Sequence, residues 1–149
     1  MAVANYHDVN GCYPPAYIAD AEGNPLHSWR VLILPYIEEQ QLFDRYDFTQ
    51  PWNSPTNLQL ASEMPAVYAF HGLASAGSET TNYLAVVGDD TLWPLAAPRR
   101  EQEITDAPAT TILFVENHGA SVHWLEPRDL HFQAMALRVN SPQGISSQY

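Results

Sequence analysis

The chain has 149 residues, of which 46% are apolar, and its formal net charge at pH 7 is −11. Its 17 acidic residues face six basic ones, all of them arginines. The apolar content argues against disorder, and the length favours one domain over residues 1–149. The shortage of basic side chains argues against nucleic acid or an anionic membrane surface as a partner.

The first 25 residues alternate between a short helix and turns. Residues 1–7 are mildly apolar, so we expect them to form the last turns of a helix. Pro14 and Pro15 predict an extended backbone over residues 13–17, because each proline fixes its own φ and disfavours helix before it. The spacing of Asp20, Glu22 and Asn24 is reminiscent of a calcium loop, but the glutamate that such a loop requires at its twelfth position is Val31 here. We therefore expect a turn without calcium.

Residues 28–46 contain the densest apolar run and predict the central core element. Ser28 is a good N-cap, and residues 29–34 are apolar apart from Arg30, so this turn should be buried on most sides. Pro35 predicts a kink and the start of a second helical segment.

The second half of the chain predicts a short helix and several strands. Ser54 and Pro55 should start a helix that ends at Met64. Strands are expected at 66–70, 82–88 and 110–116, the last one central, and a further strand at 122–125 should pair with 110–116 through a turn. This pattern predicts an α+β fold with a helix on an antiparallel sheet and long irregular loops. One core should contain Trp29, Val31, Leu32, Leu34, Phe43, Leu84, Val86, Ile112 and Phe114.

Candidates for chemistry are few. Glu116, His118 and His123 flank one predicted turn and have side chains of the types that bind zinc, but their spacing matches no zinc-enzyme motif, so we interpret them as solvated. A hydrolase nucleophile would require a Gly-x-Ser-x-Gly elbow, which the sequence lacks. Cys12 is the single cysteine and forms no internal disulfide. We predict no catalytic residue, no metal and no cofactor.

Aromatic side chains in predicted loops are the better candidates for binding. They can stack on sugars or anchor a partner, and they can equally plug the edges of a small core. The candidates are Trp52, Trp93, Trp124, Tyr13 and Tyr17.

Several motifs, taken in order, resemble one family. They are residues 5–8 (Asn-Tyr-His-Asp), 11–16 (Gly-Cys-Tyr-Pro-Pro-Ala), 28–38 around Ser-Trp-Arg-Val-Leu, 81–84 (Thr-Asn-Tyr-Leu), 104–106 with 110–116, and 124–130 with its Glu-Pro-x-Asp-Leu end. Together they resemble a large planctomycete family of secreted proteins of unknown function with a prepilin-type N-terminal cleavage and methylation segment. The resemblance covers nearly the whole chain.

This resemblance implies a type IV pilin-like fold in a protein displayed outside the cytoplasmic membrane. The domain would then lack its N-terminal hydrophobic helix, through which a full-length form contacts the membrane, and a final strand as well. A family Cys-Pro-Ser-like segment is replaced by Phe70-His71-Gly72, so the resemblance supplies no partner for Cys12. It transfers no catalytic residue.

We therefore expect a non-enzymatic, pseudopilin-like protein of the envelope or surface, extracellular or periplasmic, whose partners are other pilin-like subunits or envelope proteins. We also expect self-association through an exposed strand edge or an apolar helix groove. The alternative is an extracellular module that binds a carbohydrate or small solute through the loop tryptophans. A hydrolase is the third hypothesis.

Overall fold

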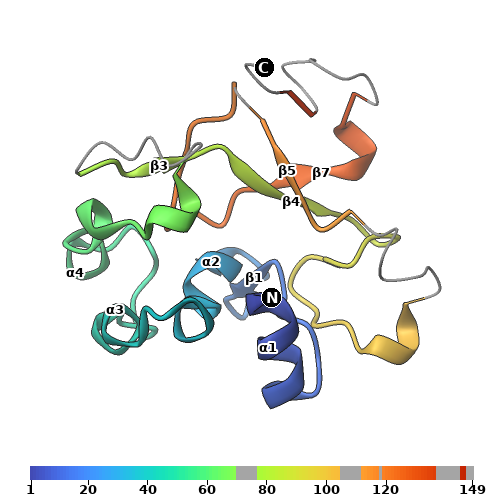
Figure 1. Ribbon diagram of the computed structural model, residues 1–149, viewed down its shortest axis with the longest axis horizontal. Helices are drawn as coiled ribbons and strands as arrows, with labels where there is room; N and C mark the ends of the chain where they lie inside the picture. The colour runs from blue at the N-terminus through green and yellow to red at the C-terminus, as the bar shows by residue number, and fades with distance from the viewer. Residues whose placement is uncertain (70–76, 105–111, 118, 137–144, 147–149) are drawn as a thin grey trace.

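Strand β4 (Tyr83–Val87) is the middle strand of the main sheet in the computed structural model (Figure 1). The structure describes residues 1–69, 77–104, 112–117, 119–136 and 145–146. The α-helices in these ranges are α1 (Ala2–Asn10), α2 (Trp29–Leu32), α3 (Gln40–Arg45) and α4 (Pro55–Leu58). The 3-10 helices are η1 (Leu34–Ile37), η2 (Ala61–Glu63), η3 (Ala66–Tyr68), η5 (Glu101–Glu103) and η7 (Phe132–Ala134).

The remaining strands are short. They are β1 (Tyr17–Ala19), β2 (Pro25–Ser28), β3 (Thr80–Thr81), β5 (Phe114–Glu116), β6 (Val122–His123) and β7 (Leu130–His131). Strand β4 pairs antiparallel with β5 and parallel with β7, which gives the sheet order β5-β4-β7. The predicted α+β class is confirmed, but this sheet is mixed, and β4 instead of residues 110–116 is central.

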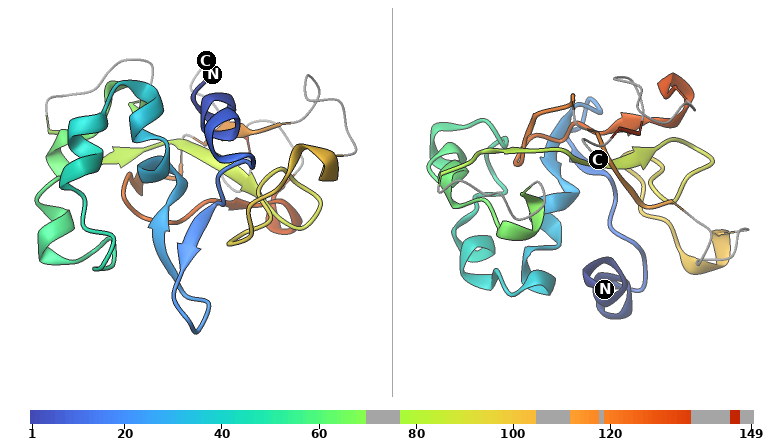
Figure 2. Two further views of the ribbon diagram at one scale, coloured as in Figure 1. Left: turned by 90° about the horizontal axis from the view of Figure 1, so that it is seen from below. Right: turned by 45° about the horizontal axis from the view of Figure 1, so that its top comes forward.

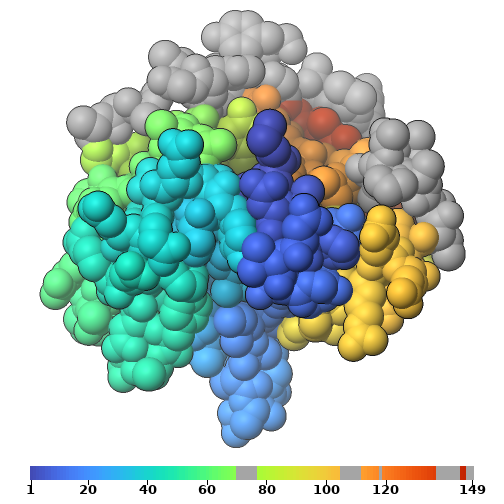
Figure 3. Space-filling view, turned by 60° about the horizontal axis from the view of Figure 1, so that its bottom comes forward, coloured from blue at the N-terminus to red at the C-terminus, as the bar shows by residue number. Residues whose placement is uncertain are grey.

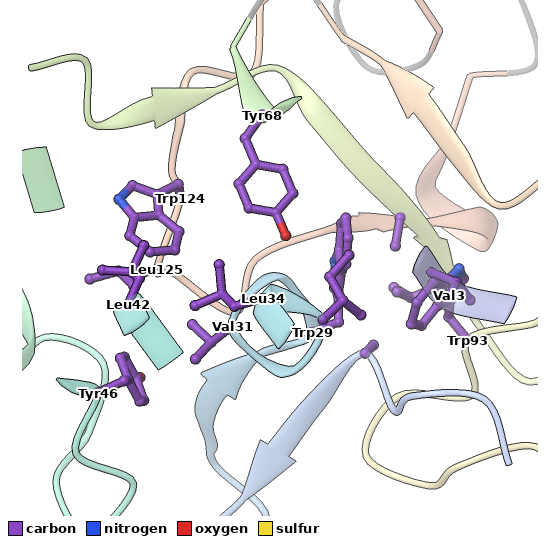
Figure 4. Close-up of a cluster of buried hydrophobic side chains, with 14 of the residues drawn as sticks. Val3, Trp29, Val31, Leu34, Leu42, Tyr46, Tyr68, Trp93, Trp124 and Leu125 are labelled. Atoms are coloured by element: carbon purple, nitrogen blue, oxygen red, sulfur yellow. The ribbon is translucent and has the colours of Figure 1, made fainter. Parts of the chain in front are cut away.

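Side chains on both faces of β4 are buried. Ala85 and Val87 face the larger apolar cluster, whereas Leu84 and Val86 face a smaller one with Val115 and Val122. This division follows from the alternation of side chains along a strand. Figure 4 shows the larger cluster, in which Trp29, Val31 and Leu34 lie close to Tyr68 and Trp124.

The predicted single core is therefore wrong in part. Trp29, Val31 and Leu34 are in the larger cluster, and Phe43 and Phe114 pack against it. Leu84 and Val86 belong to the second cluster, across the sheet. Leu32 is only half-buried, and Ile112, which precedes β5, is 54% exposed.

The central element of the sequence is built as three short helices. Ser28 accepts a hydrogen bond from the Arg30 backbone N–H and caps α2, as predicted. The chain then passes through η1, which contains Pro35, and resumes as α3 at Gln40. Glu38, in the left-handed region at φ 68°, separates the last two segments.

Two predicted strands differ from the structure. Residues 66–68 form the 3-10 helix η3, because Pro65 starts a turn in which the Tyr68 N–H donates to the Pro65 carbonyl. The predicted strand at 122–125 is reduced to β6, which pairs with β3 and not with β5. The chain turns too early for a β5–β6 hairpin, since Ala120 N–H already donates to Asn117.

The β1–β2 hairpin projects from the body of the molecule (Figures 2 and 3). Its tip is the predicted turn, in which Asp20 Oδ1 accepts hydrogen bonds from the backbone of Glu22 and Asn24. Over the part of the chain that the structure describes, no helix has the length and hydropathy of a membrane-spanning segment.

Candidate functional site: a buried Arg30–Asp129 centre

The N-terminus of α2 positions two large side chains against the main sheet. Because Ser28 caps the helix, Trp29 and Arg30 occupy its first turn, next to β4. The Trp29 ring contacts Phe114 of β5, with ring centroids 4.7 Å apart, and the Arg30 guanidinium lies 4.7 Å from the Trp29 centroid. The geometry of this turn thus joins a charged group to an aromatic layer on the sheet.

Asp129, in the segment that leads into β7, is the counter-ion of Arg30. Its Oδ1 accepts hydrogen bonds from Arg30 Nη2 at 2.9 Å and from the Ala85 backbone N–H at 2.8 Å. Trp29 Nε1 donates to both carboxylate oxygens at 3.1 Å. The side chains of Arg30 and Asp129 are 0% and 4% exposed, so this ion pair is isolated from solvent.

Backbone carbonyls complete the centre. Arg30 Nη2 also donates to the Tyr83 carbonyl at 2.8 Å, and Nη1 reaches Ser28 Oγ and the Glu126 carbonyl. The Tyr68 hydroxyl donates to the Arg30 carbonyl at 2.8 Å. Arg30 Nε has no hydrogen-bond partner among the described residues. Segments up to 100 residues apart in sequence are joined here.

Burial sets the electrostatics of this centre. It raises the pKa of the Asp129 carboxyl, and the lowering effects of Arg30, Ala85 and Trp29 offset it only in part. The carboxylate and guanidinium are both engaged in hydrogen bonds within the fold and are shielded from solvent. The arrangement can therefore lock α2, β4 and the β7 segment together, and it presents no reacting group to a substrate.

The loop tryptophans predicted to bind a ligand occupy different environments. Trp93 and Trp124 are 0% exposed and belong to the core, and their indole N–H groups donate to the Leu113 and Ala61 carbonyls. Their rings are consequently covered by protein. The sequence left two placements open for loop aromatics, at the surface or plugging the core, and these two tryptophans have the second.

The other aromatic candidates stay partly accessible. Trp52 is half-buried, and its ring centroid lies 5.4 Å from that of His123. Tyr13 is half-buried and stacks on His7, and Tyr17 is half-buried in β1. A binding role for these three residues stays a prediction.

The predicted zinc candidates are split between two sheets. Glu116 lies in β5, opposite Tyr83, whereas His123 lies in β6, opposite Thr80. His123 Nε2 is 4.0 Å from Glu79, and its Nδ1 accepts from the Leu125 backbone N–H. His118 lies outside the described residues. Within those residues, no group of three metal-binding side chains is assembled.

Sequence reasoning missed the buried centre, although both of its charged residues lie in motifs that carry the family resemblance. Arg30 stood out only as the polar exception in an apolar run. A charge in such a run requires a buried counter-ion, and that requirement was the available signal. Nothing local pointed to Asp129, which lies 99 residues away.

The fold and this centre define an α+β protein in which a short capped helix is held against a mixed sheet by a buried ion pair. Its sequence matches the model of a family described as protein of unknown function (DUF1559) over residues 1–82. This match covers more than half of the chain, which therefore belongs to that family. A search of curated proteins and a search of solved structures each gave no match.

Proposed function

We propose that this chain is a non-enzymatic, pseudopilin-like assembly subunit of an envelope or surface complex. Its partners in this proposal are other pilin-like subunits or envelope proteins, and its location is extracellular or periplasmic. The proposal also takes the chain as one pilin-like domain that is anchored to the envelope in the full-length form.

Residues of the family motifs have a structural role here, which supports an assembly function. Ser28, Trp29, Arg30 and Asp129 all form the buried centre, where they hold the fold together. A hollow of about 80 Å³ lies beside the end of β4, and this volume is well below the range for small-molecule sites. Its lining includes Asp89, Leu95 and His131.

One observation carries the proposal: two large apolar side chains are exposed at the same end of the main sheet. Ile112 precedes β5 and is 54% exposed, and Phe132 follows β7 and is 43% exposed. Strand β5 runs antiparallel to β4 and β7 runs parallel to it, so the start of β5 and the end of β7 both lie beside the end of β4. Exposed apolar side chains beside the outer strands of a sheet can pair with another subunit.

Cross-linking in the producing cells tests this function. A tagged chain should be found in the envelope or extracellular fraction, and mass spectrometry should identify cross-links to proteins of pilin-like sequence. Ile112→Lys should reduce these cross-links. Val67→Lys is the matched control, since Val67 is 59% exposed and lies in η3, which is not part of the main sheet. A chain confined to the cytoplasm, or cross-linked equally in both variants, would contradict the proposal.

The position of Trp52 favours a second candidate, a module that binds a carbohydrate or small solute. Trp52 is the tryptophan that remains half-buried, and His123, with Glu79 beside it, offers polar groups next to the indole. Binding to insoluble polysaccharides should then be lost in Trp52→Ala and kept in Phe132→Ala. Equal binding by the two variants would count against this candidate.

A further inference from the structure

The loop of residues 46–53, between α3 and α4, is attached to strand β2 through His27. This histidine is 2% exposed, and its Nδ1 lies 2.9 Å from the Tyr46 hydroxyl. Its ring makes edge contacts with Tyr46 and Phe48, with centroids 5.6 and 5.2 Å apart. The Trp52 backbone N–H donates to the Leu26 carbonyl at 3.1 Å and supplies the second attachment.

The loop is itself a rigid unit because Asn57 of α4 holds it together. The Asn57 amide donates to the carbonyls of Asp47, Gln50 and Pro51, and its Oδ1 accepts from the Asp47 N–H. Asn57 is 0% exposed. The bonds within the loop therefore do not depend on its attachment to β2.

A charge on His27 has poor compensation in this environment. Tyr46 is a neutral group, and burial raises its pKa further. Asp47 is the nearby acid, but its Oδ1 is occupied by the N–H and hydroxyl of Thr49. The Phe48 carbonyl also faces His27, and burial nevertheless dominates and lowers the pKa of the imidazole. The neutral ring thus fits this pocket better than the imidazolium.

We propose that protonation of His27 releases the 46–53 loop from β2, so that this loop is an acid-sensitive device built into the fold. Release breaks the Trp52–Leu26 hydrogen bond and frees the loop that carries the Trp52 indole. Its site of action is distinct from the exposed apolar residues of the proposed assembly surface.

The direction of the pH effect follows from linkage. A histidine with a lowered pKa in the attached state stabilises that state fully above its ordinary pKa of about 6.5. The stabilisation of the attached state is lost as the pH falls from about 6.5 through the lowered pKa of His27. Over that window, release of the loop becomes up to about tenfold more favourable per pH unit, because one proton is bound.

Amide hydrogen exchange over the pH range 7.5 to 5, corrected for the intrinsic exchange rate, tests the proposal. The protection of the Trp52 amide should fall by up to about tenfold per pH unit. The Asp47 amide, bonded within the unit, and the Ala85 amide, bonded to Asp129, should keep their protection. Parallel loss at all three amides would mean global acid unfolding and would overturn the proposal.

Two variants assign the effect to His27. His27→Gln keeps a side-chain acceptor and donor but cannot titrate, so the Trp52 amide should lose its pH response. His123→Gln is the matched control, because His123 contacts the Trp52 ring from β6 and faces Glu79 and Glu126. A response that persists in His27→Gln, or vanishes in His123→Gln, overturns the assignment.

An NMR titration of the wild-type imidazole covers the case in which His27→Gln does not fold. The His27 ring should titrate at the low-pH end of the window over which Trp52 protection falls, below its ordinary pKa of about 6.5. Tyr46→Phe removes the hydroxyl that can donate to Nδ1 of the neutral ring, so it should move the low-pH end of this window to higher pH. A His27 ring that titrates outside the pH window over which Trp52 protection falls would overturn the proposal.

Discussion

At the scale of single residues, Asp129 shows how a buried ion pair specifies a structure. Taking a carboxylate and a guanidinium out of water costs more than their attraction returns in many proteins, and the raised pKa of Asp129 is consistent with that balance. The pair therefore contributes little net free energy of folding. The pair instead fixes the relative position of α2, β4 and the β7 segment. The hydrogen bonds of Arg30 and Asp129 are satisfied only when these three segments are packed in this arrangement.

Asp129→Asn should destabilise the fold strongly, because it leaves the Arg30 charge buried without a counter-ion. We expect a loss of about 3–5 kcal/mol in the free energy of unfolding, measured by urea denaturation. Replacing Arg45, whose ion pair with Glu63 is exposed, should leave the midpoint nearly unchanged. The double variant Arg30→Met, Asp129→Leu should be more stable than Asp129→Asn; a double variant of equal or lower stability would argue against this account.

Core truncation should distinguish two neighbouring leucines. Leu34 is 0% exposed in the larger cluster, so Leu34→Ala should cost about 2–5 kcal/mol of unfolding free energy. Leu32, for which the sequence predicts the same burial, is only half-buried and should cost less. Thermal unfolding of the two variants side by side tests this order, and equal losses would show that exposure at Leu32 does not decide its contribution.

At the scale of elements, caps decide where the short helices start. Ser54 accepts a hydrogen bond from the Asn57 N–H at 3.2 Å and places Pro55 in the first turn of α4. Ser54→Ala should therefore cost about 1 kcal/mol. Thr56→Ala, at an exposed position of the same helix, is the control. Equal melting temperatures for Ser54→Ala and wild type would show that α4 does not depend on this cap.

Sequence patterns over a few neighbouring residues were sufficient to predict the helix caps, one turn and one strand. The Ser28 and Ser54 caps, the Asp20 turn and strand β4 were all predicted from the sequence, with boundaries that differ by a few residues. The partner of β6 was predicted wrongly, as residues 110–116 in place of β3, because Val122 and Thr81 are too far apart in sequence for a turn signal to join them. Residues 66–68 read as a strand by composition, but the preceding Pro65 favours a turn.

The candidate site was the least predictable part for the same reason. Its hydrogen bonds connect Trp29 and Arg30 to Tyr83 and Asp129, over separations of 53 to 100 residues. Composition and periodicity report neighbours along the chain, whereas this centre is defined by groups that only the folded chain brings together. The family motifs marked the right residues without indicating what they do.

At the scale of the whole molecule, net charge opposes the association that the apolar sheet end favours. Copies of a chain with a formal charge of −11 repel one another, and the Debye length shortens from about 30 Å at 0.01 M salt to about 8 Å at 0.15 M. Apolar contact between copies does not weaken with salt in this way. The ionic strength should therefore control whether the chain assembles.

We accordingly predict that the chain self-associates through the sheet end that exposes Ile112 and Phe132, and that association increases with salt. Light scattering over a range of concentrations at 0.01 M and 0.15 M NaCl measures it. Ile112→Lys and Phe132→Lys should each keep the protein monomeric at both salt concentrations, because a lysine there must be desolvated on contact. Val67→Lys adds the same charge at a position that is 59% exposed on η3 and should associate like wild type. A strictly monomeric wild type at high concentration and high salt, or equal effects of all three lysines, would contradict this assignment of the surface.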